Sequence, residues 1–393
     1  MSTNIIAPGS GFANSSIVSY NFNMLEIIDT GIIYANPIPH LKSVHAYFPS
    51  VAQLPDGKLI AVYSLGEAFE ALNLHTYYSF SYDGGRSWHF MGQFQKKTKG
   101  KITSDASRIT ITPDGELVVL MCVYDRTKYR KQGLTNPETL GFVPTHFYLF
   151  RSIDGGKTFT KPKLIKTPIE GPSFELCCPI VIISDKTWLL PTSTWKAWNG
   201  YCPSGIKAIA MISTDEGKTW KDCFVVMDAY KKGIIFWESK IIEMPDGNLL
   251  AVAWAYDLKN RRDLPDHYTI SKNCGKTWSK PLSTKLHGQT LTPMVLKNGR
   301  ILSVYRRMDK PGLWANISRL ERNRWINESE TPIWGTNLKG LTGNTKNPST
   351  DFHVLKFGAP SMIRLNDGSI FLTFWCYENC ISVIRWFKIL EEK

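Results

Sequence analysis

Apolar runs joined by short polar turns recur along this chain. The first example, residues 45–64, reads HAYFPSVAQLPDGKLIAVYS, with a Pro-Asp-Gly turn between two apolar segments. Apolar runs rich in β-branched and aromatic residues on either side of a tight turn are typical of two antiparallel strands. The pattern therefore predicts a β-hairpin here.

Five further segments align with this hairpin, at 105–125, 175–195, 237–257, 289–307 and 358–378. The six turn positions are Asp56, Asp114, Asp185, Asp246, Asn298 and Asp367, at intervals of 52 to 71 residues. Units of this size hold about four strands, as does one blade of a β-propeller. The repeat therefore predicts an all-β fold, a six-bladed β-propeller with four-stranded antiparallel blades.

A second repeat is interleaved with the first. The segments SYDGGRSW (81–88), SIDGGKTF (152–159), STDEGKTW (213–220) and SKNCGKTW (271–278) fit the pattern S-x-D-x-G-x-[ST]-[WF], with Asn273 replacing Asp in the last. The Asp can accept hydrogen bonds from loop N–H groups, and the Gly permits a positive φ. The position of each copy predicts a turn between the third and fourth strands of a blade.

This second element resembles the Asp-box of the sialidase (neuraminidase) superfamily, whose fold is a six-bladed propeller. The resemblance covers roughly residues 40–390 and implies a single domain over 1–393. The implied blades are roughly 40–100, 101–170, 171–230, 231–285, 286–345 and 346–393, with segment 1–39 completing the last. In that superfamily the Asp-boxes lie on the rim away from the active site, so they predict architecture and not catalysis.

The composition and charge limit the classes of binding partner that the sequence supports. The net charge of +13 is spread in short groups such as 95–101 and 129–132. Because no nucleic-acid-binding motif accompanies them, a basic surface is favoured over a nucleic-acid partner. No apolar run is long enough for a membrane span, and no signal peptide is visible. The expected location is cytoplasmic, or extracellular if a signal has been removed.

Eight cysteines are present and none forms a CxxC pair. Most of them lie in strand-like apolar runs, where buried free thiols are more common than metal ligands. Neither a metal site nor a cofactor is expected.

Three carboxylates stand where the inner strands begin. In a propeller the first strand of each blade lines the central axis. Asp105, Glu175 and Glu238 come from successive blades and would converge at one opening. Ionised groups are costly among apolar strands unless they are paired or serve a functional cleft. Hydrolysis of a glycosidic bond needs two carboxyl groups, whereas the alternative is that each closes a salt bridge between blades.

The expected sialidase residues are only partly present. The superfamily opens its first blade with a Phe-Arg-Ile-Pro-like motif, and here Tyr47 takes the Arg position. Trp254 replaces a second Arg, and segment 357–360 lacks the nucleophilic Tyr, although Glu238 matches the Glu that supports that Tyr. A bidentate carboxylate clamp cannot be built from Tyr and Trp. Sialic-acid hydrolysis is therefore disfavoured.

Two Glu residues on neighbouring inner strands are similar to the arrangement in exo-arabinanases, which share the six-bladed fold. This resemblance implies Glu175 as nucleophile and Glu238 as acid/base, with the reverse left open and Asp105 in reserve. A carboxyl separation of about 5–5.5 Å would predict retention of configuration, and about 6.5–9.5 Å inversion.

The remaining residues of the expected opening suit a sugar. Aromatic side chains stack on sugar faces or pack in the core, and Arg side chains bind hydroxyls or an acidic group. The candidate substrate-binding residues are Tyr47, Arg108, Trp237, Trp254, Arg306, Trp375, His45 and His353. The two histidines are possible proton donors or ordinary surface residues. Loops 127–144, 195–205 and 335–354 are expected to surround the cleft.

The sequence as a whole predicts an exo-acting glycoside hydrolase whose partner is an oligo- or polysaccharide, with an anionic glycan left open. One alternative is a glycan-binding propeller without catalysis, which the missing sialidase residues favour. Another is a polysaccharide lyase on an acidic glycan, with His or Tyr as base.

Overall fold

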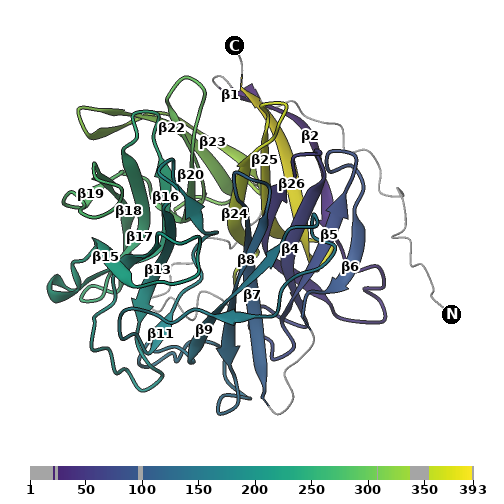
Figure 1. Ribbon diagram of the computed structural model, residues 1–393, viewed down its shortest axis with the longest axis horizontal. Coiled ribbons are helices and arrows are strands. Elements are labelled where there is room, and N and C mark those ends of the chain that lie inside the picture. The colour runs from purple at the N-terminus through teal and green to yellow at the C-terminus, as the bar shows by residue number, and fades with distance from the viewer. Residues whose placement is uncertain (1–20, 23–24, 96–100, 308, 337–353, 392–393) are drawn as a thin grey trace.

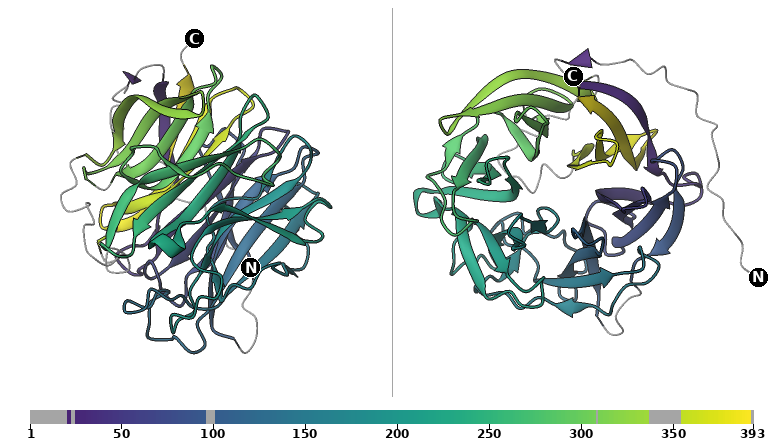
Figure 2. Two further views of the ribbon diagram at one scale, coloured as in Figure 1. Left: turned by 90° about the vertical axis from the view of Figure 1, so that its left-hand side faces the viewer. Right: turned by 45° about the horizontal axis from the view of Figure 1, so that its top comes forward.

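The computed structural model describes residues 21–22, 25–95, 101–307, 309–336 and 354–391. Six antiparallel sheets, each built on four strands, surround a central axis as the blades of a propeller (Figure 1; Figure 2, right). The predicted fold class is therefore confirmed. Within the described residues, no helix has the length and apolar character that a membrane crossing requires.

The first two blades follow the chain from the axis outwards. Blade 1 contains β3 (His45–Gln53), β4 (Leu59–Gly66), β5 (His75–Ser81) and β6 (His89–Gln93). Blade 2 contains β7 (Thr103–Ile111), β8 (Leu117–Asp125), β9 (Thr145–Ser152) and β10 (Lys163–Leu164).

Blade 3 has a divided inner strand. Both β11 (Ser173–Phe174) and β12 (Val181–Ile182) pair with β13 (Trp188–Trp195), which is followed by β14 (Ala208–Ser213) and β15 (Asp222–Met227). The interruption, residues 175–180, contains Glu175. A single 3-10 turn, η1 (Tyr230–Lys232), leads to blade 4.

Blades 4 and 5 are regular. Blade 4 contains β16 (Ile234–Glu243), β17 (Leu249–Asp257), β18 (Arg262–Ser271) and β19 (Leu282–Ser283). Blade 5 contains β20 (Gly288–Val295), β21 (Ile301–Arg307), β22 (Leu313–Glu321) and β23 (Arg324–Trp334).

Blade 6 is built from two distant parts of the chain. Its inner strands are β24 (Phe357–Arg364), β25 (Ile370–Glu378) and β26 (Ile381–Glu391), and β2 (Leu25–Tyr34) pairs with β26 from outside. The short β1 (Asn21–Phe22) pairs with β2. Figure 2 (right) shows the N-terminal strand beside the C-terminal one, where they close the ring.

The core lies between the blades. The second strand of each blade is covered on both faces by neighbouring blades, so its residues are apolar on both faces and not only on alternate positions. All eight residues of β4, for example, are buried. Stacking of blade on blade therefore explains the continuous apolar runs after each turn.

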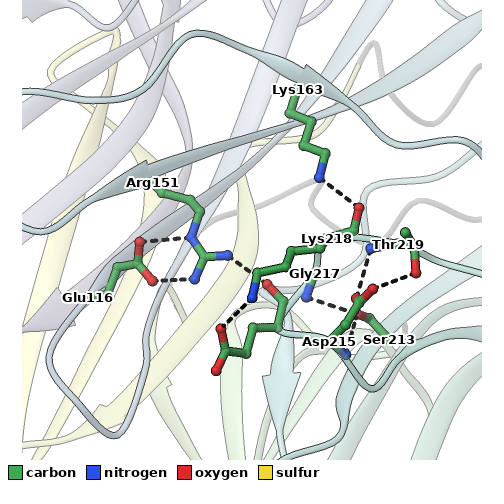
Figure 3. Close-up of polar contacts among 9 residues, drawn as sticks. Glu116, Arg151, Lys163, Ser213, Asp215, Gly217, Lys218 and Thr219 are labelled. Carbon is green, nitrogen blue, oxygen red and sulfur yellow. Dashed lines mark hydrogen bonds and ion pairs between the residues drawn. The ribbon is translucent and has the colours of Figure 1, made fainter.

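The second sequence repeat forms compact turns at the outer rim. In the third copy, Asp215 accepts hydrogen bonds from the backbone N–H of Thr219 (2.8 Å) and from its hydroxyl (2.6 Å). The Ser213 hydroxyl donates to Asp215 and accepts the Gly217 N–H, each near 2.8 Å (Figure 3). These bonds hold the pKa of the Asp215 carboxyl well below its usual range.

The same turn fastens blade 3 to blade 2. Arg151 of β9 forms an ion pair with Glu116 and donates to the carbonyl of Glu216 at 2.7 Å. Lys163 of β10 donates to the carbonyl of Lys218, also at 2.7 Å (Figure 3). The turn therefore joins adjacent blades on the outside of the ring.

Candidate functional site

A cavity of about 610 Å³ runs along the propeller axis. It follows the inner strands of all six blades over most of their length, from Phe48 to Gln53 on β3 and from Ala359 to Arg364 on β24. One concave space with a few polar groups among apolar walls is the usual form of a small-molecule site.

Three loops add to the wall of the cavity. Leu134, Thr135, Leu140 and Phe142 line it, as does Trp195 at the end of β13. A hydrogen bond of 2.7 Å from the Trp195 indole N–H to the Leu140 carbonyl joins the two segments. Phe69 and Glu70, between β4 and β5, line it from blade 1. Loops 127–144 and 195–205 thus lie where the sequence predicted, whereas 337–353 fall outside the described residues.

Four inner strands carry a β-bulge where they meet the cavity. The pairing register shifts after Tyr47, Trp237, Gln289 and Gly358. At each bulge one non-glycine residue has a positive φ: Phe48, Glu238, Thr290 and Ala359, with values of 48° to 58°. All four stand eight residues before the turn residue of their hairpin. Positive φ is uncommon outside glycine, and bulges re-aim side chains next to active sites.

The bulge of blade 4 brings Glu238 to Glu175 of blade 3. The backbone N–H of Glu238 donates to Glu175 Oε2 at 2.9 Å, and both side chains line the cavity. The Cys177 thiol donates to the same oxygen at 3.5 Å. Burial, followed by the negative charge of Glu238, raises the pKa of Glu175 above its ordinary value. Glu175 therefore lies beside Glu238 with a raised affinity for a proton.

A third carboxyl group that lines the cavity, Glu70, stands on the loop between β4 and β5. Burial raises the pKa of Glu70 to about 7, against the opposing effects of the Leu134 backbone N–H and the Arg126 charge. Arg126, almost fully buried, donates to the Glu70 carbonyl at 3.0 Å and so fixes this loop. The alignment of the six hairpins could not predict Glu70, because this residue lies outside the aligned segments.

Two buried cations hold the bulges of neighbouring blades. Arg108 donates to the Phe48 carbonyl at 3.3 Å, and Lys240 donates to the carbonyls of Thr290 and Leu291 at 3.1 and 3.0 Å. Each is 8% exposed and lines the cavity. Lys240 was not among the predicted residues, although it occupies the same alignment column as Arg108, six residues before the turn.

The predicted tryptophans form much of the apolar wall. Trp237, Trp254 and Trp375 all line the cavity. Trp237 and Trp254 meet edge to face with ring centroids 4.5 Å apart, and the Trp254 indole N–H donates to Asp263 at 2.5 Å. Arg306 also lines the cavity, where it donates to Gln289 and to the Phe357 carbonyl.

Three predicted residues lie elsewhere. The Asp105 carboxylate accepts hydrogen bonds from His75 and from the Thr76 backbone, both at 2.7 Å, and faces blade 1. Tyr47 is fully buried, with its hydroxyl 3.1 Å from that of Tyr377. His45 accepts the Ser382 N–H at 3.1 Å. None of the three lines the described part of the cavity.

His353 falls outside the described residues. Among those that are described, no group of three or more His, Cys, Asp and Glu side chains could hold a metal ion.

The fold and the axial cavity define a six-bladed β-propeller with a candidate site on its axis. The chain superposes on the crystal structure of a protein of unknown function from Dyadobacter fermentans, with a TM-score of 0.71 and 17% identity, over 94% of this chain and 100% of that chain. No protein-family profile and no curated protein matches the sequence.

Sialidases themselves share the fold. The match to Trypanosoma rangeli sialidase in complex with sialic acid has a TM-score of 0.60 and 14% identity, over 88% of this chain and 54% of that one. The match to NanB sialidase from Streptococcus pneumoniae has a TM-score of 0.59 and 12% sequence identity, over 88% of this chain and 68% of that one. This chain thus spans about half the length of the trypanosomal enzyme, and at such identities the likeness concerns the fold alone.

Proposed function

We propose that this protein is a glycoside hydrolase that cleaves terminal sugars from a glycan with Glu175 and Glu238. The observation that supports it is the paired arrangement of these carboxyl groups in the axial cavity, with Glu175 Oε2 2.9 Å from the Glu238 backbone nitrogen. Two carboxyl groups in different protonation states are what glycosidic cleavage requires.

The raised pKa of Glu175 favours the reverse of the first assignment from the sequence. Glu175 then gives its proton to the glycosidic oxygen as the C–O bond breaks. Glu238 either attacks the anomeric carbon directly or takes a proton from a water that attacks it. In the first case a water, deprotonated by Glu175, then displaces Glu238 and releases the sugar. The aromatic wall of Trp237, Trp254 and Trp375 offers stacking surfaces for the sugar ring.

The test is a screen of aryl glycosides and polysaccharides with the wild type and with E175Q and E238Q. Each substitution is expected to lower kcat by at least about 100-fold, because general acid–base catalysis contributes 10²–10⁴-fold. E216Q, on an exposed turn of the rim, is the matched control and is expected to keep full activity. Activity that survives both E175Q and E238Q would rule out the assignment.

The alternatives make different predictions in the same screen. A glycan-binding propeller would bind sugars with no turnover in any variant. A lyase would release unsaturated products and needs a His or Tyr base. Among the described lining residues, Tyr124 is the only one of either type, and burial raises its pKa well above the ordinary value, which makes it a poor base.

A further inference from the structure

Arg306 is the cavity residue whose geometry bears most directly on the charge of the ligand. It lies on β21, is 4% exposed, and stands directly opposite Gln289 in the β20–β21 ladder. Its Nε donates to Gln289 Oε1 at 3.0 Å, and its Nη2 donates to the same oxygen. These two N–H groups form the edge with which an arginine grips a carboxylate.

The third nitrogen of the guanidinium, Nη1, is also hydrogen-bonded to the protein. Nη1 donates to the Phe357 carbonyl of blade 6 at 3.0 Å. The next residue is Gly358, and a Cβ there would overlap Nη1. The position of Arg306 therefore depends on an amide from its own blade, a carbonyl from the next and the absence of a side chain at residue 358.

From this geometry we infer that Gln289 occupies the anion-binding edge of Arg306, so that the cavity selects uncharged sugars over acidic ones. The inference rests on the proposed function in so far as the ligand is a glycan. Gln289 is 2% exposed and is not among the described residues that line the cavity, so it acts through Arg306. Its amide oxygen takes up the two N–H groups that the carboxylate of a uronic or sialic acid would need.

The other cations of the cavity agree with this selection. Arg108 and Lys240 are bonded to backbone carbonyls of the bulges. Arg364 donates to the Val295 carbonyl at 2.9 Å and pairs with Glu391. All four basic side chains that line the described cavity are thus held by protein oxygen atoms. An acidic ligand would have to displace these bonds before it gained a cation, whereas a neutral sugar would not.

The experiment compares binding of matched neutral and acidic sugars. The probes are 4-nitrophenyl glucoside with the glucuronide, and the galactoside with the galacturonide, each as both anomers. Affinity is measured by calorimetry, with tryptophan fluorescence as a second readout because four tryptophans line the cavity. The wild type is expected to bind the neutral member of at least one pair at least tenfold more tightly.

Two substitutions of Gln289 test whether its contact with Arg306 causes the preference for neutral sugars. Q289A releases the edge of Arg306 and is expected to move the ratio at least tenfold towards the acidic sugar. Q289E keeps an oxygen acceptor of the same size and is expected to retain the preference for the neutral sugar. The double variant Q289A/R306M is expected to lose the gain of Q289A. Thermal melting of each variant checks that it is folded, and Q289S serves if Q289A is not.

The inference is overturned if the wild type prefers the acidic sugar, if it binds no probe, or if Q289A and Q289E shift the ratio equally. Binding does not require turnover. A neutral preference that responds to Q289A in a protein with no hydrolytic activity would therefore refute the proposed function and leave this inference standing.

Discussion

Glu175 owes its affinity for a proton to two features of its surroundings. It lies in the gap of the inner strand of blade 3, where burial penalises the charged form, and Glu238 adds a like charge from blade 4. The Glu238 N–H and the Cys177 thiol stabilise the anion but do not outweigh these effects. The result is a carboxyl group whose pKa is about 7 and whose ordinary value is 4.5.

This shift predicts how stability and activity change with pH. Because the folded pKa is the higher one, the folded state binds the proton more tightly, and its extra stability is present below about pH 4.5 and lost as pH rises through about 7. E175Q is expected to flatten the fall in unfolding free energy between pH 5 and 8 by about 1–3 kcal/mol. The rate of hydrolysis by the wild type should decline as pH rises from 5 to 8, because Glu175, the general acid, loses its proton.

Denaturant titrations at each pH measure the stability change. Since the pKa of Glu70 is raised in the same window, part of the slope should remain in E175Q and disappear in E175Q combined with E70Q. Identical slopes for the wild type and E175Q would contradict the account.

Cavity-lining residues could be predicted from the sequence more readily when they stand at equivalent positions of the six aligned hairpins than when they stand outside them. Glu175, Glu238, Arg108, Trp237, Trp254, Arg306 and Trp375 all line the cavity. Tyr47 does not, because the bulge that follows it turns Phe48 to the axis instead. Asp105 does not, because β7 has no bulge and its ladder is regular. Glu70 was missed because it stands on a loop that no other blade repeats.

Among the elements, the bulged inner strands shape the cavity most directly. Each places one non-glycine residue at positive φ, a conformation that costs on the order of 1–3 kcal/mol. Thr290 is the most unfavourable case because it is β-branched. The strain persists because cross-blade bonds fix the bulges, such as that from Lys240 to the carbonyls of Thr290 and Leu291.

Two threonines on β20 allow a matched test of this strain. T290G removes a side chain from a position with φ of 58°, and its stability is expected to be unchanged or raised by up to about 1 kcal/mol. T292G lies on the regular part of the strand and loses the 2.6 Å bond from its hydroxyl to the Pro360 carbonyl. It is expected to lose about 1–3 kcal/mol. Equal losses in thermal or denaturant unfolding would show that Thr290 is not strained.

The hairpins could be predicted because their turns carry a local signal, whereas the bulges have only a weak one. Pro-Asp-Gly fixes a turn by its own chemistry. A bulge depends on contacts with the next blade, which are far away in the sequence. The prolines at 49 and 360, which directly follow Phe48 and Ala359, are the available hint, since a residue without an N–H suits a break in the ladder.

The whole molecule is a ring, and its closure depends on the contact between β2 and β26. Gly31 faces Trp386 across this pairing, and a Cβ on Gly31 would lie 2.8 Å from the indole. Trp386 is 1% exposed and stacks on Phe371 with centroids 5.0 Å apart, so it has little room to move.

G31A is therefore expected to lower the free energy of unfolding by about 1–3 kcal/mol, as overpacking of a close-packed site does. I32A, at an exposed position of the same strand, is the control and should change it by less than about 0.5 kcal/mol. Thermal unfolding of the two variants distinguishes them. A melting temperature of G31A equal to that of the wild type would mean that the ring is not held together at this contact.

The number of blades could be predicted at this scale because six hairpins repeat in the sequence. The walls of the cavity could be predicted only in part, since they combine repeated strands with loops of unequal length. The length and aromatic residues of loops 127–144 and 195–205 predicted that they would border the cavity, and each contributes to its wall. The approach of Glu238 to Glu175 depends in addition on the bulge of blade 4.

The pairing of β2 with β26 also sets an order of events during synthesis. The hydroxyl of Thr30 donates to the carbonyl of Trp386, 356 residues further along the chain. On the ribosome, β2 is made before the first blade but cannot take its place until β26 has left the exit tunnel. Contacts of such long sequence separation form slowly. Until then β2 lacks the strand with which it pairs in the closed ring, and its open edge favours aggregation of the nascent chain.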